Sequence, residues 1–297
     1  MLDISQVSSN IMLKQAYISY AYKNPKWKYE TIVELHNYIY SQTDPTQYNL
    51  LELEIKFGNF KAEGAYKNYF LFNKDIFKLP QYLNDNVNSI NFESGLRESQ
   101  FYALNYFLEL ECKKNSDIRK IEPLKYNETI YNSGKRKSEI YNLKNELIKI
   151  ETIRKDEKHH IQLRNNSNDF RITIAKEFPS DVTDKDTVEL FRDKFRISYK
   201  FRFFRLDLTI VSTSKSLQEK NFGGSVTYEV EFEFDEINIR AKDFENFEAF
   251  YKIIERYLDN AFSIYEVITK EYFSQFYAIN KNSESIFGDY IENILKK

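Results

Sequence analysis

Three glutamates occupy alternate positions of one short segment late in the chain. They are Glu229, Glu231 and Glu233, in Tyr-Glu-Val-Glu-Phe-Glu-Phe. Successive side chains of a β-strand point to opposite faces, so a strand here places three carboxylates on one face and apolar side chains on the other. Like charges along one strand face repel each other. The segment therefore predicts a strand whose acidic face needs cations.

A second segment near the start of the chain repeats this arrangement. Glu52 and Glu54 alternate in Leu-Glu-Leu-Glu-Ile-Lys-Phe-Gly, and Lys56 continues the same face. Two acidic strand faces in one chain indicate a bound cation that offsets their repulsion. Carboxylate oxygens suit a hard divalent cation such as Mg²⁺ or Mn²⁺.

Three further strand segments carry basic or mixed charges on one face. The side chains that share a face are Arg192, Lys194 and Arg196 in the first, Arg205, Asp207 and Thr209 in the second, and Asp169, Arg171, Thr173 and Glu177 in the third. Each such face, taken alone, is typical of a solvent-exposed strand. Taken together, and with strongly apolar opposite faces, the five strands favour a barrel whose polar faces line the interior.

A charged interior of this kind constrains the ligand. We expect about four to six carboxylates and a similar number of cations, which must pair with each other or bind ligands. Rows of arginine and lysine suit phosphate oxygens. The carboxylates and the cations together predict a site for a metal-bound polyphosphate.

Composition agrees with a β-rich protein and excludes some classes. Aromatic residues make up 16% of the 297 residues, against 7 glycines and 5 prolines, which favours strands. The net charge of −2 gives no global basic field that attracts nucleic acid. Cys112 is the single cysteine, so we expect no intrachain disulfide and a reducing, intracellular compartment. We expect neither a signal peptide nor a membrane span.

The order of the expected elements gives a β-rich α+β fold with helices at both ends. We expect a strand at about 49–58, a short strand at 68–72, and then strands at 125–132, 135–142, 146–154, 158–164, 169–178, 191–200, 202–212 and 226–235. Helices are predicted at about 26–40, 99–113, 243–259 and 261–278. This pattern indicates an antiparallel meander, closed or nearly closed. One domain would span 1–297, with an N-terminal helical segment at 1–47, barrel strands at 48–236 and C-terminal helices at 241–297.

The three histidines form no zinc-like cluster. The pair His159 and His160 is interpreted as part of a solvated strand, and His36 lies far from it in the sequence.

The charged segments resemble a known family, the metal-dependent RNA 5′-triphosphatases of fungal and protozoan mRNA capping, within the triphosphate tunnel metalloenzymes. The resemblance rests on Glu-Leu-Glu-Ile-Lys-Phe-Gly at 52–58, the basic and mixed strands at 192–209, and Tyr-Glu-Val-Glu-Phe-Glu at 228–233, in the family's order. Phe-Glu-Ser-Gly at 92–95 and the strand at 169–177 also fit, so the similarity covers about residues 30–260.

The resemblance implies an eight-stranded antiparallel tunnel with packing helices outside, and it implies roles for the charged side chains. Glu52, Glu54 and Glu233 would bind the metal directly. Glu231 and Glu229 would act through water or basic neighbours, and Glu231 is included among the metal-site residues. Glu177 would orient the attacking water. The cations that would contact phosphate are Lys56, Arg136, Lys158, Arg171, Arg192, Lys194, Arg196 and Arg205, of which Arg136, Lys194 and Arg196 are also counted as catalytic. Asp207 and Thr209 would support these groups.

Two positions of the family pattern stay open. Either Lys155 or Lys158 could supply a basic side chain inside the tunnel, but their odd separation lets only one of them face inward on a regular strand. Lys158 is preferred. Glu128 is the candidate for the acidic residue that usually precedes the tunnel arginine.

The implied activity is hydrolysis of the γ-phosphate of a 5′-triphosphate RNA end, with Mg²⁺ or Mn²⁺, in the nucleus. The partners would be the 5′ end of nascent RNA and a guanylyltransferase on a separate chain, since no Lys-x-Asp-Gly segment occurs; the resemblance also admits a homodimer. One alternative is a tripolyphosphatase or nucleoside triphosphatase of the same superfamily. Another is a non-catalytic barrel subunit of the transcription machinery, which should lack the paired glutamates.

Overall fold

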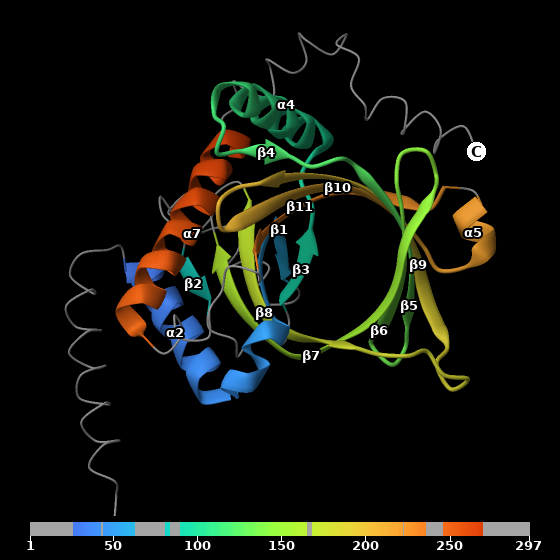
Figure 1. The fold of residues 1–297 in the computed structure, drawn as a ribbon, viewed down its shortest axis with the longest axis horizontal. Helices are drawn as coiled ribbons and strands as arrows, with labels where there is room; N and C mark the ends of the chain where they lie inside the picture. The colour runs from blue at the N-terminus through green and yellow to red at the C-terminus, as the bar shows by residue number, and fades with distance from the viewer. Residues whose placement is uncertain are drawn as a thin grey trace, which may run out of the picture.

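Eight antiparallel strands close into a barrel. The computed structural model describes residues 26–42, 44–62, 81–83, 90–164, 168–221, 223–235 and 246–269. Around the barrel the order is β10-β11-β1-β8-β7-β6-β5-β9, and β9 pairs with β10 to close it (Figure 1). The strands are β1 (Leu51–Ala62), β5 (Leu124–Tyr131), β6 (Lys135–Tyr141), β7 (Leu147–Arg164), β8 (Asp169–Pro179), β9 (Val188–Lys200), β10 (Phe204–Ser214) and β11 (Ser225–Phe234). The predicted β-rich barrel is confirmed.

The first barrel strand joins two meanders. Strands β5 to β8 are consecutive neighbours, and so are β9 to β11, while β1 lies between β11 and β8. This placement sets the two acidic strands side by side in antiparallel register, with Glu54 opposite Glu233 and Lys56 opposite Glu231. The inward glutamates of β1 and β11 therefore form one continuous surface, which we call the acidic wall.

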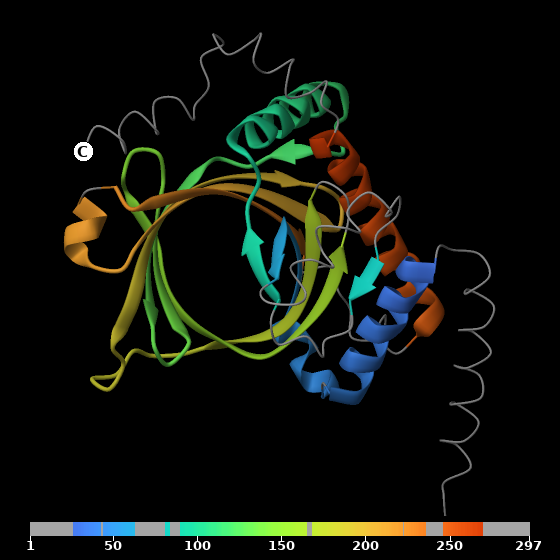
Figure 2. The ribbon, with the colours of Figure 1, turned by 180° about the vertical axis from the view of Figure 1, so that it is seen from behind.

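The long helices lie outside the barrel, mainly on one side. Helices α2 (Lys26–Gln42), α4 (Glu98–Lys114) and α7 (Phe247–Thr269) gather there, and β5 and β6 form the opposite wall (Figures 1 and 2). The apolar stripe of α7 includes Tyr251, Ile254 and Tyr257, each at most 1% exposed. The Tyr257 hydroxyl donates a hydrogen bond to the carbonyl oxygen of Phe232 and ties α7 to β11.

Two predicted boundaries are wrong. The strands expected at 146–154 and 158–164 are one strand, β7, which continues through a β-bulge between Asp156 and His159. The helix break expected between 259 and 261 does not occur, because α7 is continuous to Thr269. Its buried face continues from Leu258 to Ala261 without a glycine or proline to interrupt it. The rest of the helix predicted to 278 lies outside the described residues.

Shorter elements extend the sheet and connect the strands. They are a 3₁₀ turn at Pro45–Leu50, β2 (Gln81–Leu83), β3 (Ile90–Ser94), β4 (Arg119–Lys120) and α5 (Leu217–Asn221). Strand β3 pairs with the end of β1, and β2 pairs with β7. The strand predicted at 68–72 lies outside the described residues. None of the described helices has the length and hydropathy of a membrane span.

Candidate active site in the barrel interior

The barrel interior contains more charge than the sequence suggested. Eight carboxylates on the inward faces form ion pairs with interior cations, namely Glu52, Glu54, Glu128, Glu177, Asp207, Glu229, Glu231 and Glu233. Eight Lys and Arg side chains accompany them, namely Lys56, Arg136, Lys155, Arg171, Arg192, Lys194, Arg196 and Arg205. The interior therefore keeps its charges by pairing acidic with basic groups across strands.

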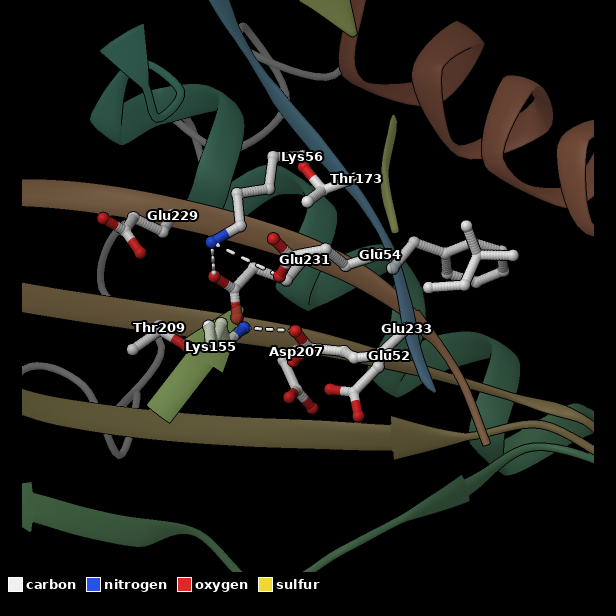
Figure 3. A network of polar contacts seen from close by, with 12 residues as sticks. Glu52, Glu54, Lys56, Lys155, Thr173, Asp207, Thr209, Glu229, Glu231 and Glu233 are labelled. Atoms are coloured by element: carbon white, nitrogen blue, oxygen red, sulfur yellow. Dashed lines mark hydrogen bonds and ion pairs between the residues drawn. The ribbon is translucent and has the colours of Figure 1, made fainter. Parts of the chain in front are cut away.

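Lys56 lies within the acidic wall. Its Nζ is 2.6 Å from Glu231 and 3.4 Å from Glu54, and Glu229 lies nearby (Figure 3). Burial favours the neutral amine, but Glu231, Glu54 and Glu229 outweigh it and raise the pKa of Lys56. Burial likewise opposes ionisation of Glu231, yet Lys56 and Arg196 hold its pKa well below the usual range. Lys56 therefore favours the ionised form of Glu231 in the middle of the acidic wall.

Two arginines extend this network around Asp207, which has no exposed surface. Arg196 lies 2.9 Å from Asp207 and 3.2 Å from Glu231, and it also donates to the hydroxyl of Thr209 at 3.2 Å. Arg205 donates to Asp207 at 3.0 Å and forms an ion pair with Glu233. Asp207 thus contacts two guanidinium groups, that of Arg196 on β9 and that of Arg205 on β10.

Glu128 is the centre of a third group of charges. Lys194 lies 2.7 Å from it, and Arg136 and Arg192 each lie 3.9 Å away. Burial opposes its ionisation, but these three cations lower its pKa. Burial, with the help of the three nearby arginines, lowers the pKa of Lys194 to about 7 in spite of Glu128. Lys194 is therefore a cation that an additional anion would stabilise.

Lys155, not Lys158, faces the interior. Lys155 forms an ion pair with Glu52 and lies 3.1 Å from Glu177, whereas Lys158 is exposed. A bulge lies between Asp156 and His159, so the alternation of a regular strand does not hold from one lysine to the other. The sequence preference for Lys158 is corrected in favour of Lys155.

Two carboxylates that the sequence analysis assigns to the metal have raised pKa values. Burial, together with Glu54 and Glu177, raises the pKa of Glu52 to about 7 despite Lys155. Burial, together with Asp207 and Glu52, raises the pKa of Glu233 to about 8 despite Arg205. The charges of these two carboxylates are therefore poorly stabilised at the end of the acidic wall, mainly because the groups are buried. A divalent cation would stabilise them, and the oxygen ligands suit Mg²⁺ or Mn²⁺.

The geometry of these carboxylates does not itself form a closed metal cage. Within the part of the chain that the structure describes, no three His, Cys, Asp or Glu side chains are grouped closely enough to hold a metal ion. Lys155 and Arg205 contact Glu52 and Glu233 instead. The chemistry of the donor set fits a divalent cation, and binding would require these two cations to release their glutamates.

Sequence reasoning missed two further interior residues. His160 is only partly exposed: its Nδ1 lies 3.1 Å from the Thr173 hydroxyl, and burial with Arg171 lowers its pKa to about 4. Tyr126 lies under the guanidinium of Arg196, whose Cζ is 5.1 Å from the ring centre. Tyr126 lies two residues before Glu128 on the same strand, so the alternation of side chains could have indicated that it faces the interior.

The chain is similar to known proteins in sequence and in structure. The family model described as mRNA capping enzyme, beta chain, matches residues 25–270. No curated protein matches the sequence. The structure of the S. pombe Pct1 RNA triphosphatase superposes with a TM-score of 0.63 at 18% identity, covering 81% of this chain and 93% of that chain. The same protein in complex with the Spt5 CTD gives 0.62 at 20% identity with the same coverage.

The match spans the whole barrel with its helices α2 and α7, and the structural likeness shows the same fold. Together with the charged interior, these findings identify this chain as a member of the mRNA capping enzyme beta chain family, the RNA 5′-triphosphatases of the tunnel type.

Proposed function

We propose that this chain removes the γ-phosphate of a 5′-triphosphate RNA inside its barrel and leaves a 5′-diphosphate end for guanylyl transfer. The observation that carries the proposal is one closed barrel lined by eight carboxylates and eight cations. Phosphoryl transfer depends on positioning and on neutralising charge, so it needs no catalytic cysteine or histidine. The interior provides both.

The end of the acidic wall is the proposed metal site. Glu52, Glu54 and Glu233 would hold Mg²⁺ or Mn²⁺, with Glu231 and Glu229 as supports. Such an ion neutralises charge on the γ-phosphate. The raised pKa values of Glu52 and Glu233 support this assignment, because burial leaves both carboxylate charges poorly stabilised in spite of Lys155 and Arg205.

The interior cations would hold the phosphates. The set is Lys56, Arg136, Lys155, Arg171, Arg192, Lys194, Arg196 and Arg205, with Asp207 and Thr209 orienting the arginines of β9 and β10. A guanidinium group can donate two parallel hydrogen bonds to the oxygens of one phosphate. A polyphosphate would also return Lys194 to its charged form, because its lowered pKa reflects repulsion by arginines as well as burial.

Glu177 is the proposed group that positions the attacking water. It lies 3.1 Å from Lys155 and 3.6 Å from Arg136, at the edge of the proposed metal site. The two cations hold its carboxylate in place, so that it can accept a proton from water in line with the leaving diphosphate.

The remaining proposals concern the cellular setting. The chain would act on nascent RNA in the nucleus, with the guanylyltransferase on another polypeptide and with a homodimer as one assembly to test. Pct1 has been seen in complex with the Spt5 CTD. A comparable peptide of the transcription machinery is a candidate partner here.

Phosphate release from γ-labelled triphosphate RNA tests the proposal directly. The purified chain should release phosphate with Mg²⁺ or Mn²⁺ and lose this activity with EDTA. ATP and inorganic tripolyphosphate serve as parallel substrates, and a strong preference for either would favour the tripolyphosphatase alternative. Absence of hydrolysis of all three substrates would favour a non-catalytic barrel and remove the enzyme assignment.

A further inference from the structure

Arg171 differs from the other interior cations. Seven of the eight form ion pairs with interior carboxylates, whereas Arg171 forms no ion pair or hydrogen bond with any described residue. Its guanidinium carbon instead lies 4.7 Å from the centre of the Phe92 ring. Its Nε is buried without a partner, and its terminal amino groups are not among the buried unpaired atoms. Arg171 therefore has donors available for a ligand.

Phe92 reaches the interior because position 58 is glycine. Strand β3 pairs with the end of β1, where Gly58 lies opposite Ser94 and Phe60 opposite Phe92. A side chain at 58 would share the inward face of Lys56, and its Cβ would lie 2.7 Å from the Phe92 ring and 2.1 Å from a β3 carbonyl oxygen. The missing side chain thus leaves room for an aromatic ring, which also packs on Phe60 with 5.1 Å between ring centres.

This pair marks one end of the charged interior. Along β8, Arg171 lies six residues before Glu177 on the same face, which corresponds to about 20 Å of strand. The opposing residues of β1 run from Glu52, opposite Ala175, through Glu54 to Lys56, opposite Arg171. The proposed metal site therefore lies between the proposed water-binding Glu177 and Arg171.

We propose that Arg171 and Phe92 form the subsite for the first nucleotide of the RNA substrate. Phe92 holds one face of the guanidinium, the other face stacks on the first base, and the terminal amino groups bind the α-phosphate. Arginine planes stack on nucleobases, and their paired donors match phosphate oxygens. The subsite rests on the proposed function, since it needs the γ-phosphate to lie at the metal site.

The subsite gives the barrel a means of separating RNA from inorganic tripolyphosphate. Tripolyphosphate has no base and no ribose, so only the phosphate contacts remain for it. The seven paired cations serve both substrates alike, while the Arg171 plane serves only the nucleotide. Phe92 is a positioning residue in this scheme, because it acts through Arg171.

The test is the ratio of kcat/KM for triphosphate RNA to kcat/KM for tripolyphosphate. Phe92→Leu keeps an apolar side chain but removes the ring, and the ratio should fall about tenfold, mainly through KM for RNA. Phe92→Tyr should restore the ratio. Arg171→Lys keeps the positive charge but removes the guanidinium plane, and it should also lower the ratio. This variant provides the test if Phe92→Leu fails to fold.

Tyr40→Leu is the matched control, since it removes an exposed aromatic ring of α2 and should leave the ratio unchanged. Equal losses on both substrates in Phe92→Leu and Arg171→Lys, or no loss in either, would overturn the subsite and leave the proposed function intact. A wild-type chain that hydrolyses neither substrate would overturn the proposed function and the subsite together.

Discussion

The two faces of the acidic wall are equally buried but differ in chemistry. On the outer face of β1 and β11, Ile55 and Phe232 are at most 1% exposed beneath the helices. On the inner face of the same strands, Glu54 and Glu231 are only 6% and 8% exposed. Burial therefore does not distinguish the packed face from the functional face. The difference is that the outer face is covered by a second layer, and the inner face by its own cations.

This comparison separates stability from activity. Apolar burial on the outer face stabilises the fold, whereas buried ion pairs regain little more than the cost of removing charges from water. Changes on the outer face should therefore lower the free energy of unfolding. Changes on the inner face should mainly lower activity.

The largest effect on stability is expected for Phe232→Ala. Phe232 is fully buried and stacks on Tyr257, with 5.0 Å between ring centres. The cavity should lower the free energy of unfolding by about 3–5 kcal/mol, measured by urea denaturation. Phe232→Leu is the control and should lose less. A loss below about 1 kcal/mol would show that α7 does not stabilise the barrel.

Glu233→Gln is the matching change one residue away on the inner face. It should lower metal-dependent phosphate release by about 10³-fold, because an anionic metal ligand becomes neutral. Its free energy of unfolding without metal should change little, since Arg205 keeps Asp207 as a partner. Retention of normal turnover with Mg²⁺ and Mn²⁺ would remove Glu233 from the metal site.

The strands of both faces were predictable, but the order of the strands was not. Alternation in Glu229–Phe234 fixes which side chains share a face, because period two is a local property of the backbone. The pairing of β1 with β11 depends on how distant segments close the barrel. Local alternation therefore gave both acidic strands without showing that Glu54 lies opposite Glu233.

The site was predictable to the same extent. The charged positions of regular strands fall inside the barrel, whereas the choice between Lys155 and Lys158 was wrong where a bulge interrupts β7. Phe92 had no charge pattern to mark it, and its place depends on the pairing of β3 with Gly58. Irregular backbone and added strands are the features that local periodicity leaves out.

The two lysines of β7 test this correction. Lys155→Ala should lower phosphate release by about 100-fold, since it removes the cation between Glu52 and Glu177. Lys158→Ala is the matched control and should retain nearly full activity, because its side chain is exposed. The opposite result would place Lys158 in the interior during turnover.

The pH dependence of Glu52→Gln isolates the charge of one inner-face carboxyl. The pKa of Glu52 is raised to about 7, so the folded protein binds this proton more tightly than the unfolded chain. Metal-free wild type therefore loses stability from this group as pH rises from about 4.5 towards 7. Relative to wild type, Glu52→Gln should become more stable over this range by at least about 1 kcal/mol.

Urea denaturation of both proteins at several pH values gives this difference. Taking the difference removes the titration of His160 and Lys194, which both proteins share. Mg²⁺ should stabilise wild type more than Glu52→Gln at pH 8. A stability difference that is constant with pH would mean that the ion pair with Lys155 keeps the pKa of Glu52 at its ordinary value.

The smallest effect is expected for Tyr257→Phe, which keeps the outer face apolar. The variant loses one hydroxyl, which donates to the carbonyl oxygen of Phe232 and lies 3.3 Å from that of Leu53. Burial raises the pKa of this hydroxyl well above its usual range, so it stays a neutral donor. The free energy of unfolding should fall by about 1 kcal/mol, the usual net value of one hydrogen bond. Phosphate release should be unchanged, since the hydroxyl lies on the far side of the wall from the glutamates; a large loss of activity without a loss of stability would show that the outer face also positions the inner one.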